Sequence, residues 1–497
     1  MLTDERPLIE LATVTDLPLL SESTTAPDPQ TVYGAWWARW GPIAPVLIEH
    51  GVPAWLVMGY QECCAIMRSE YSFSRDPRNW RWNQENLLPE GAGIRAFSPP
   101  EPRAGSYHHD GETRRRLRQA LDDAIADLPD AQIKAATRLV CTEAIARFDA
   151  PGPVDLIADY ATPVSFLATA AMLGIEGDAA MQLMRDSEII ARHQPGGLEA
   201  RARIGATLMG HVRASRERFG RDLTSSLVRH PNMRSDAEVV DSAAVPLHAA
   251  SMFLGAWIGR ALHLELADAA FRARWSGGRL GLDDALDQVL WRDTPVANSC
   301  APRYAMHDTV LDGNKAVRRG DALVLALSAA NHDPAVHSSD PWDEVGNRSH
   351  LAWGTGPHTC PAPAQARLVT RTAIDVLLQQ VDLTLMVPAD QVEWAPTPWV
   401  RQPRRLPAEA SLPVLHGHQV PILGDNRDTW TTRPAPSSQA RPGPAGHPGN
   451  LDGTGDQVPW LEDTPPPTPT TPARGSTAPE AETPGVPSWS DLLHRST

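Results

Sequence analysis

The segment from His350 to Arg367, HLAWGTGPHTCPAPAQAR, constrains this chain more than any other stretch. Glycines and a proline give the loop before Cys360 a fixed path. Pro361 stands where the first turn of a helix tolerates proline. Apolar residues then recur at helical spacing between Ala364 and Val381, namely Leu368, Val369, Ile374, Leu377, Leu378 and Val381. The pattern predicts a helix whose N-terminus directly follows Cys360.

This position favours a thiolate at Cys360, because the free N–H groups and the dipole of a helix N-terminus stabilise negative charge on sulfur. A thiolate held there is suited to be a metal ligand or a nucleophile, whereas a lone cysteine at a helix start is more often buried and inert. A zinc site through His358 and Cys360 lacks two further ligands at conventional spacing. We therefore set zinc aside.

Composition and charge argue against several classes of protein. The chain has 497 residues and a formal net charge of −15, which argues against nucleic-acid binding. Its five cysteines form no CxxC pair and no secretory signal precedes them, so a disulfide framework is not expected. No uninterrupted apolar run reaches the roughly 18–20 residues of a membrane span. We expect a cytoplasmic protein with reduced cysteines and no membrane contact.

The chain divides into three parts by composition. Residues 1–29 form an N-terminal extension, and residues 30–420 form one mixed, mainly helical body with small β-sheets. The segment 425–497 carries 14 prolines in 73 residues, together with many Ser, Thr and Gly. Such a segment buries too little apolar surface to order itself, so we expect a disordered tail.

Within the body, periodicity and turn signals predict five elements. They are a strand at Pro53–Tyr60, a helix directly after it, a helical run from Gly111 to Phe148, a long apolar helix from Ala237 to Ala270, and strands around the turn Asp312-Gly313.

The order of these landmarks resembles a bacterial cytochrome P450. The family signature Phe-Gly-x-Gly-x-His-x-Cys-x-Gly is matched by Trp353-Gly354-Thr355-Gly356-Pro357-His358-Thr359-Cys360-Pro361-Ala362. The resemblance covers residues 30 to 415 and implies a haem b group between the long central helix and the Cys-loop helix. It also implies that Cys360 ligates the haem iron, and a thiolate ligand favours cleavage of the O–O bond of dioxygen.

The resemblance further implies contacts to the two haem propionates. Arg303 of CAPRYAM and His358 match the family positions after the K helix and in the cysteine loop. The C-helix motif Asp-Gly-x-x-His-x-x-Leu-Arg reads DGETRRRLR here, so Arg118 matches the final arginine and Arg114 replaces the histidine.

Members of this family commonly receive electrons at a basic surface, and the resemblance implies a ferredoxin with its reductase as redox partner. Arg115, Arg116 and Arg371 are the residues that this surface would use here. A solvated helix face is the alternative for Arg115 and Arg116. The substrates implied are dioxygen and a small organic molecule.

Two departures from the family bear on this interpretation. The K-helix pair Glu-x-x-Arg is replaced by Gln288-Val289-Leu290-Trp291, as in a small actinobacterial subgroup that the chain resembles. Asp287 and Arg292 lie one residue away and therefore face other directions on a helix. Because both partners are lost together, we expect that no buried charge is left orphaned and that Trp291 fills the volume.

The second departure is in the I helix, where the family carries an acid and a hydroxyl that relay protons. Met252 takes the place of the acid and Phe253 that of the hydroxyl, and Ser251 and His248 are the nearest polar side chains. Either the distal pocket is dry and delivers protons poorly, or Met252 and Phe253 face the core and Ser251 or a substrate group supplies the relay. Positioned proton transfer is typically worth about 10²–10⁴-fold in rate.

Two functions follow. The first is a haem-thiolate monooxygenase that inserts one oxygen atom of dioxygen into a small organic substrate. The alternative is a haem protein of the same fold with weakened or lost oxygenation, used as a sensor. Relatives of the deviant subgroup are often encoded beside a sensor kinase and a small GTPase, so the alternative implies a signalling protein as partner. We predict the monooxygenase.

Overall fold

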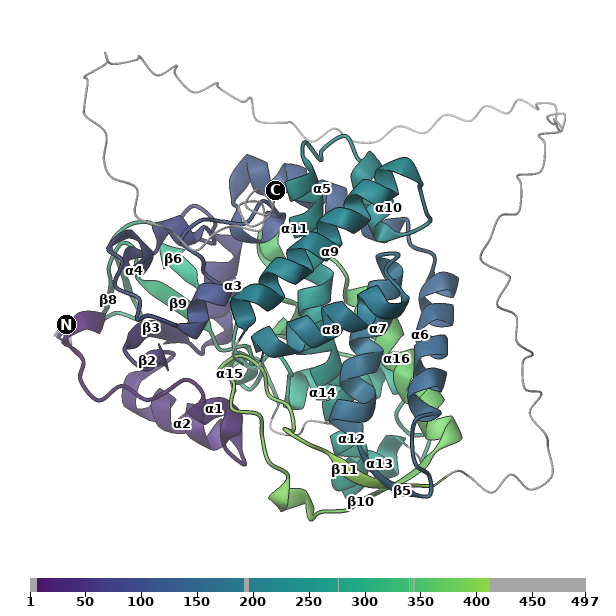
Figure 1. The fold of residues 1–497 in the computed structure, drawn as a ribbon. Helices are drawn as coiled ribbons and strands as arrows, with labels where there is room; N and C mark the ends of the chain where they lie inside the picture. The colour runs from purple at the N-terminus through teal and green to yellow at the C-terminus, as the bar shows by residue number, and fades with distance from the viewer. Residues whose placement is uncertain are drawn as a thin grey trace, which may run out of the picture. The chain divides into compact units, whose positions relative to one another are not determined.

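The computed structural model describes residues 7–191, 196–275, 277–338, 340, 342 and 345–411. Within these residues the chain is mainly helical with small β-sheets (Figure 1), which confirms the predicted α+β class. The predicted tail, 425–497, lies outside the described residues.

In Figure 1, helices α5 to α14 and α16 form a helical part around the long stretch of α11 and α12, whereas α1, α2 and α4 lie on the side of strands β2, β3, β6 and β9. Their bounds are α1 (Glu22–Thr25), α2 (Pro29–Trp40), α3 (Tyr60–Arg68), α4 (Arg81–Gln84), α5 (Gly111–Ala126), α6 (Asp130–Ile145), α7 (Thr162–Met172), α8 (Gly177–Ala191), α9 (Gly197–Glu217), α10 (Leu223–Arg229), α11 (Asp236–Ala249), α12 (Gly255–Ala267), α13 (Ala269–Trp275), α14 (Leu282–Arg292), α15 (Leu327–Asn331) and α16 (Pro363–Gln380).

The strands form a larger sheet in the order β2-β3-β9-β6-β4 and two smaller sheets in the orders β1-β8-β7 and β10-β11-β5. Their bounds are β1 (Ile9–Glu10), β2 (Ile43–Glu49), β3 (Val52–Val57), β4 (Phe73–Ser74), β5 (Gly152–Asp155), β6 (Arg303–Ala305), β7 (Thr309–Leu311), β8 (Lys315–Val317), β9 (Ala322–Leu325), β10 (Asp382–Leu385) and β11 (Pro407–Ser411). The strand predicted at Pro53–Tyr60 is present as β3 but ends at Val57, since Tyr60 begins α3, and the predicted turn Asp312-Gly313 joins β7 to β8.

Two local predictions need correction. The helical run predicted from Gly111 to Phe148 is divided into α5 and α6 at Pro129, because proline has no N–H to continue the helical hydrogen bonds. Residues before position 30 also take part in the body, since Ile9 pairs with Lys315 and Leu20 is fully buried.

The predicted central helix runs from Asp236 to Ala267 as α11, a π-helical turn at Ala250–Leu254, and α12. It begins where the hydroxyl of Ser235 accepts a hydrogen bond from the amide of Glu238. By length and composition alone this stretch could cross a membrane, but 56% of its most apolar window is buried. It also contributes to three of the apolar clusters among the described residues, which identifies it as the core helix.

The loop that carries Cys360 is held against α3. Gly354 and Gly356 have φ angles of +67° and +73°, and a Cβ on Gly356 would lie 2.7 Å from the carbonyl oxygen of Met67. The helix after the loop, α16, begins two residues later than predicted, so that Pro363 rather than Pro361 occupies its first position. Leu378, predicted for the apolar face, is 36% exposed.

We expect Gly356→Ala to destabilise the protein, because the left-handed backbone alone costs an L-residue about 1–2 kcal/mol and the contact with Met67 adds to it. Thermal unfolding of the variant should therefore begin at a lower temperature. The matched control is Gly34→Ala within α2, where a Cβ meets nothing within 4 Å and alanine is favourable by about 1 kcal/mol. Equal melting temperatures of the two variants would contradict this account.

Candidate functional site

A cavity of about 320 Å³ lies between the central helix and the loop that carries Cys360. Its walls are mostly apolar and come from α5, α7, the central helix, the chain before β6, the cysteine loop and α16. Five cationic or titratable nitrogen-bearing side chains line it, namely Arg75, Arg114, Arg118, Arg303 and His358. The structure therefore brings Cys360 and the four predicted propionate contacts to one cavity.

Cys360 sits at the end of the loop with its backbone fixed by a hydrogen bond from its amide to the carbonyl of Trp353 (2.8 Å). The amide of Ala362 points at the sulfur from 3.5 Å and donates to it. Burial raises the pKa of the Cys360 thiol, while this amide and the Arg118 guanidinium oppose the rise. A cation or a metal at the sulfur would reverse the effect of burial, because a coordinating thiol is deprotonated.

Arg303, at the start of β6, is buried, and its Nε and Nη1 atoms have no hydrogen-bond partner. The same two atoms of Arg75 are also buried and unsatisfied, and the Arg75 guanidinium lies over the ring of Tyr107. Burial lowers the pKa of Arg303 to about 9, with the neighbouring Arg75 adding to the effect. Unpaired guanidinium N–H groups in a cavity call for an anion.

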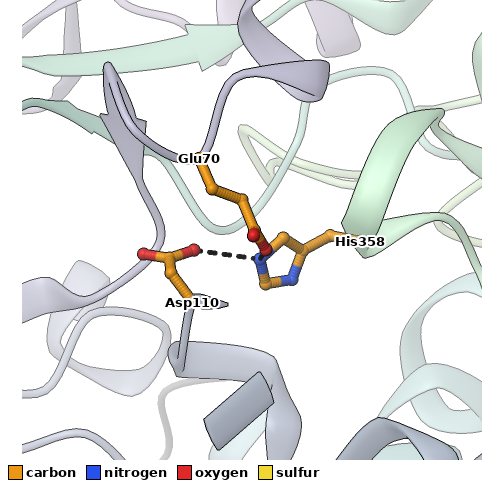
Figure 2. A group of neighbouring side chains, drawn as sticks. All are labelled: Glu70, Asp110 and His358. Carbon is orange, nitrogen blue, oxygen red and sulfur yellow. Dashed lines mark hydrogen bonds and ion pairs between the residues drawn. The ribbon is translucent and has the colours of Figure 1, made fainter. Parts of the chain in front are cut away.

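His358 lies between two carboxylates. Figure 2 shows its ring directed toward Glu70 and Asp110, and its Nε2 atom is 3.2 Å from Glu70 Oε1 and 3.1 Å from Asp110 Oδ1. Arg114 completes the group, because its Nε atom lies 2.7 Å from Glu70. Burial raises the pKa of both carboxyls, but the hydrogen bond and charge of His358 act together with Arg114 and an amide at Glu70, and with Ser74 and an amide at Asp110, to leave both pKa values lowered.

The three side chains of Figure 2 have the donor types of a metal site. Their oxygens are nevertheless engaged by the protein, since Asp110 accepts from Ser74 and from the amide of Arg75, and Glu70 pairs with Arg114. The group is better described as an ion-pair cluster that orients His358 at the edge of the cavity.

Arg118 lies in the cavity wall close to Cys360 and pairs with Asp122 one helical turn away (2.6 Å). Arg114 also lines the cavity and donates to the carbonyl of Pro357 (2.8 Å). Both arginines therefore brace the cysteine loop as well as facing the cavity.

The polar and apolar residues predicted at the middle of the central helix line two different cavities. Phe253 lines the cavity together with Ala249 and Ala250, whereas Ser251 and Met252 line a second cavity on a neighbouring face. The hydroxyl of Ser251 donates to the carbonyl of His248 (2.9 Å) and is thus engaged within the helix. The helix face toward Cys360 carries no acid or hydroxyl at these positions.

Comparisons with known proteins show which proteins this chain resembles. No family model matches the chain. It is 27% identical to cytochrome P450 105C1 of a Streptomyces species over 71% of this chain and 87% of that protein. It is also 27% identical to the cytochrome P450 monooxygenase PikC of Streptomyces venezuelae, over 79% of this chain and 94% of that protein. The solved structure of CYP154C4 from Streptomyces sp. W2061 has a TM-score of 0.70 at 23% identity and covers 80% of this chain and 98% of its own.

The chain is similar to cytochrome P450s over most of its length and has their fold.

The P450s that the chain resembles use haem, and the cavity of Cys360 fits that group. A haem is flat and apolar with two carboxylates, and the cavity offers apolar walls, a cysteine sulfur and two guanidinium groups whose N–H atoms lack partners. Arg75 was not among the residues predicted from the sequence. It follows β4, and β4 pairs with β6, which carries Arg303, so only the strand pairing brings the two arginines together.

Helix α14, which corresponds to the K helix of the P450 fold, carries an ion-pair network that the sequence analysis missed. Asp287 is 1% exposed and receives Arg348 (Nε to Oδ2, 3.0 Å), His350 and Arg367. Asp287 is buried but paired, in line with the expectation that no buried charge is left orphaned, while its role at the centre of a network was not predicted. Asp287 ties α14 to the segment before the cysteine loop and to α16, across the gap left by the missing Glu-x-x-Arg pair.

Trp291 makes a further contact between α14 and the segment before the cysteine loop. It is buried, donates from Nε1 to the carbonyl of Asn347 (2.7 Å) and stacks on His337 at 5.0 Å. Arg292 faces elsewhere and pairs with Asp268. The tryptophan thus fills volume, as expected, and also fixes the chain that leads to the cysteine loop.

We expect Asp287→Asn to lower the free energy of unfolding by about 3 kcal/mol at neutral pH, because the largely buried Arg367 and the buried His350 lose the carboxylate that they contact. Asp283→Asn, which breaks the exposed pair with Arg371, is the control and should cost less than about 1 kcal/mol. Similar losses of stability in the two variants would contradict the role of Asp287 in tying α14 to the segment before the cysteine loop and to α16.

The difference in stability between the wild type and Asp287→Asn should depend on pH. Burial raises the pKa of Asp287, but hydrogen bonds from His350 and Arg367 outweigh it and hold the pKa below the ordinary 3.8. A depressed pKa gives stability that is present above the unfolded-state value and is lost as pH falls through the folded-state value. The difference between wild type and Asp287→Asn should therefore shrink below pH 3.8.

Proposed function

We propose that this P450 is a haem-thiolate monooxygenase that inserts one oxygen atom into a small organic substrate, with Cys360 as the axial ligand of haem b. The observation that carries the proposal is the shared cavity of Cys360, Arg303 and Arg75. The relative PikC is itself described as a monooxygenase. A sensor without oxygenation has no support among the relatives, and we do not pursue it.

When bound, a thiolate-ligated haem supplies dioxygen activation, in which electron donation from sulfur favours O–O cleavage. The protein's own part begins at Cys360, where the Ala362 amide and the Arg118 guanidinium favour negative charge on sulfur. Arg303 and Arg75 are proposed to pair with the propionates, because their N–H groups otherwise remain buried and unsatisfied. His358 and Arg114 would add contacts at the same edge.

On the opposite side of the cavity, Ala249, Ala250 and Phe253 present an apolar helix face. This face excludes water and holds no proton donor of its own. Protons must then arrive through a water or a group of the substrate, and we propose slow turnover for that reason, since a positioned donor is worth about 10²–10⁴-fold.

The proposed redox partner is an acidic ferredoxin with its reductase in the cytoplasm. Among the predicted surface arginines, Arg115 on α5 is exposed. Arg116 instead pairs with Glu238 (2.7 Å), and Arg371 pairs with Asp283 (2.8 Å). Arg115 is therefore the residue of the three best placed to attract a partner.

The carbon monoxide difference spectrum of the dithionite-reduced protein tests the haem ligand. We expect a red-shifted, thiolate-type Soret band in the wild type and its loss in Cys360→Ala, because alanine offers no ligand. Cys300→Ala is the matched control, since Cys300 lines the same cavity and hydrogen-bonds Tyr107. A band that survives in Cys360→Ala would refute the assignment.

Charge reversal tests the partner surface. Arg115→Glu should slow reduction by an acidic ferredoxin at low ionic strength by about tenfold, and the effect should fade as salt screens the charge. The control is Arg213→Glu on α9, another exposed arginine. An unchanged reduction rate in Arg115→Glu would remove this surface from the proposal.

A further inference from the structure

A second cavity of about 320 Å³ lies on another face of the central helix. Its walls include Ser251 and Met252 of the π turn, the loop before α5, α8, α9 and the segment Pro396–Trp399. Many of the lining side chains are apolar, among them Ile94, Phe97, Leu208, Leu247 and Trp399. A cavity of this kind suits the apolar body of a small molecule.

The imidazole of His248 enters this lining from the central helix, and its ring packs on Phe97 with the ring centroids 5.5 Å apart. Among the described residues, none forms a hydrogen bond with either ring nitrogen of His248. Neither nitrogen is sealed off within the protein, unlike the unsatisfied ring nitrogens of His263 and His350. His248 therefore offers free hydrogen-bonding capacity to a molecule in the cavity.

His248 is neutral at physiological pH. Burial lowers the pKa of its imidazole to about 3, and the positive charges of Arg103 and Arg201 act in the same direction. A neutral imidazole has one N–H donor and one nitrogen lone pair that accepts. Such a group matches a hydroxyl, which donates and accepts, or a carbonyl, which accepts. It offers no positive charge to a carboxylate.

The charged side chains of the lining are engaged elsewhere in the protein. Glu49 accepts hydrogen bonds from the amides of Gly93 (2.9 Å) and Ile94 (3.1 Å). Arg103 donates to the carbonyl of Ala96 (2.9 Å), and neither it nor Arg201 is without a partner. His248 thus keeps hydrogen-bonding capacity that these charged neighbours have already used.

We propose that this cavity binds an apolar molecule with a neutral hydroxyl or carbonyl group, and that His248 selects this group through a hydrogen bond. The apolar body of the molecule lies against Phe97, Leu247 and Trp399. A site that hydrogen-bonds one polar group of its ligand discriminates against analogues without that group, because its own polar atoms are then left unpaired. The inference rests on the proposed function in one respect, namely that such a molecule would be the substrate of the monooxygenase.

Calorimetric titration of the full-length, haem-loaded protein with 1-nonanol and with nonanoate tests the class of ligand. The two probes have chains of equal length and differ in the charge of their polar end. 1-Nonanol should bind more tightly than nonanoate, because desolvation of a carboxylate is costly where no cation is free to pair with it. Tighter binding of nonanoate, or no detectable binding of 1-nonanol, would overturn the proposal.

Variants of His248 test its role with 1-nonanol and 1-fluorononane, in which fluorine replaces the hydroxyl. His248→Phe keeps an aromatic ring beside Phe97 and removes both nitrogens. It should weaken binding of 1-nonanol by about three- to tenfold, as expected for one neutral hydrogen bond, and change binding of 1-fluorononane by less than about twofold. His248→Leu should give the same result and decides if the Phe variant does not fold. Equal effects on the two probes would refute the role of His248.

Two further variants serve as controls for hydrogen bonding and for the substitution itself. His248→Gln retains a donor and an acceptor, so it should keep most of the affinity for 1-nonanol. A loss as large as that in His248→Phe would contradict recognition by a hydrogen bond. His307→Phe replaces an exposed histidine outside the lining of this cavity and should leave the ratio of the two dissociation constants unchanged.

The outcome is separable from that of the proposed function. Binding of 1-nonanol that depends on His248, in a protein without a thiolate-type carbon monoxide spectrum, would leave this site standing and remove the monooxygenase. A thiolate-type spectrum without binding that depends on His248 would remove this site alone.

Discussion

The buried carboxylate of Asp287 makes the interactions on which the position of the cysteine loop depends. One oxygen of Asp287 meets His350 and Arg367 and the other meets Arg348, so a single residue joins α14, the chain before the cysteine loop and α16. Trp291 adds a hydrogen bond to that same chain. The cysteine loop keeps its path because both of its flanks are anchored, and its glycines let it lie against α3.

The second organising element is the central helix, which serves two cavities with different faces. One face presents Ala249, Ala250 and Phe253 to the cavity of Cys360, and a neighbouring face presents His248, Ser251 and Met252 to the second cavity. The departures from the family's acid and hydroxyl therefore have different meanings. Phe253 lines the cavity of Cys360, whereas Met252 lines the second cavity.

Charge is distributed unequally between these cavities. Around His358 the cations are partly balanced by Glu70 and Asp110, which leaves Arg303 and Arg75 for the proposed propionates. In the second cavity Glu49 is engaged with backbone amides. Buried guanidinium groups are costly without an anion, so the unsatisfied N–H groups of Arg303 and Arg75 point to a ligand.

The sequence by itself determined the elements that depend on local chemistry. The loop and helix around Cys360, the strand β3, the turn at Asp312 and the central helix follow from spacing, glycine and proline, which act between near neighbours. The tertiary structure alone decided the partners of Asp287, the pairing that brings Arg75 to Arg303, and which helix face meets which cavity. These contacts join residues far apart in the chain, and no local periodicity records which distant side chain a buried charge will meet.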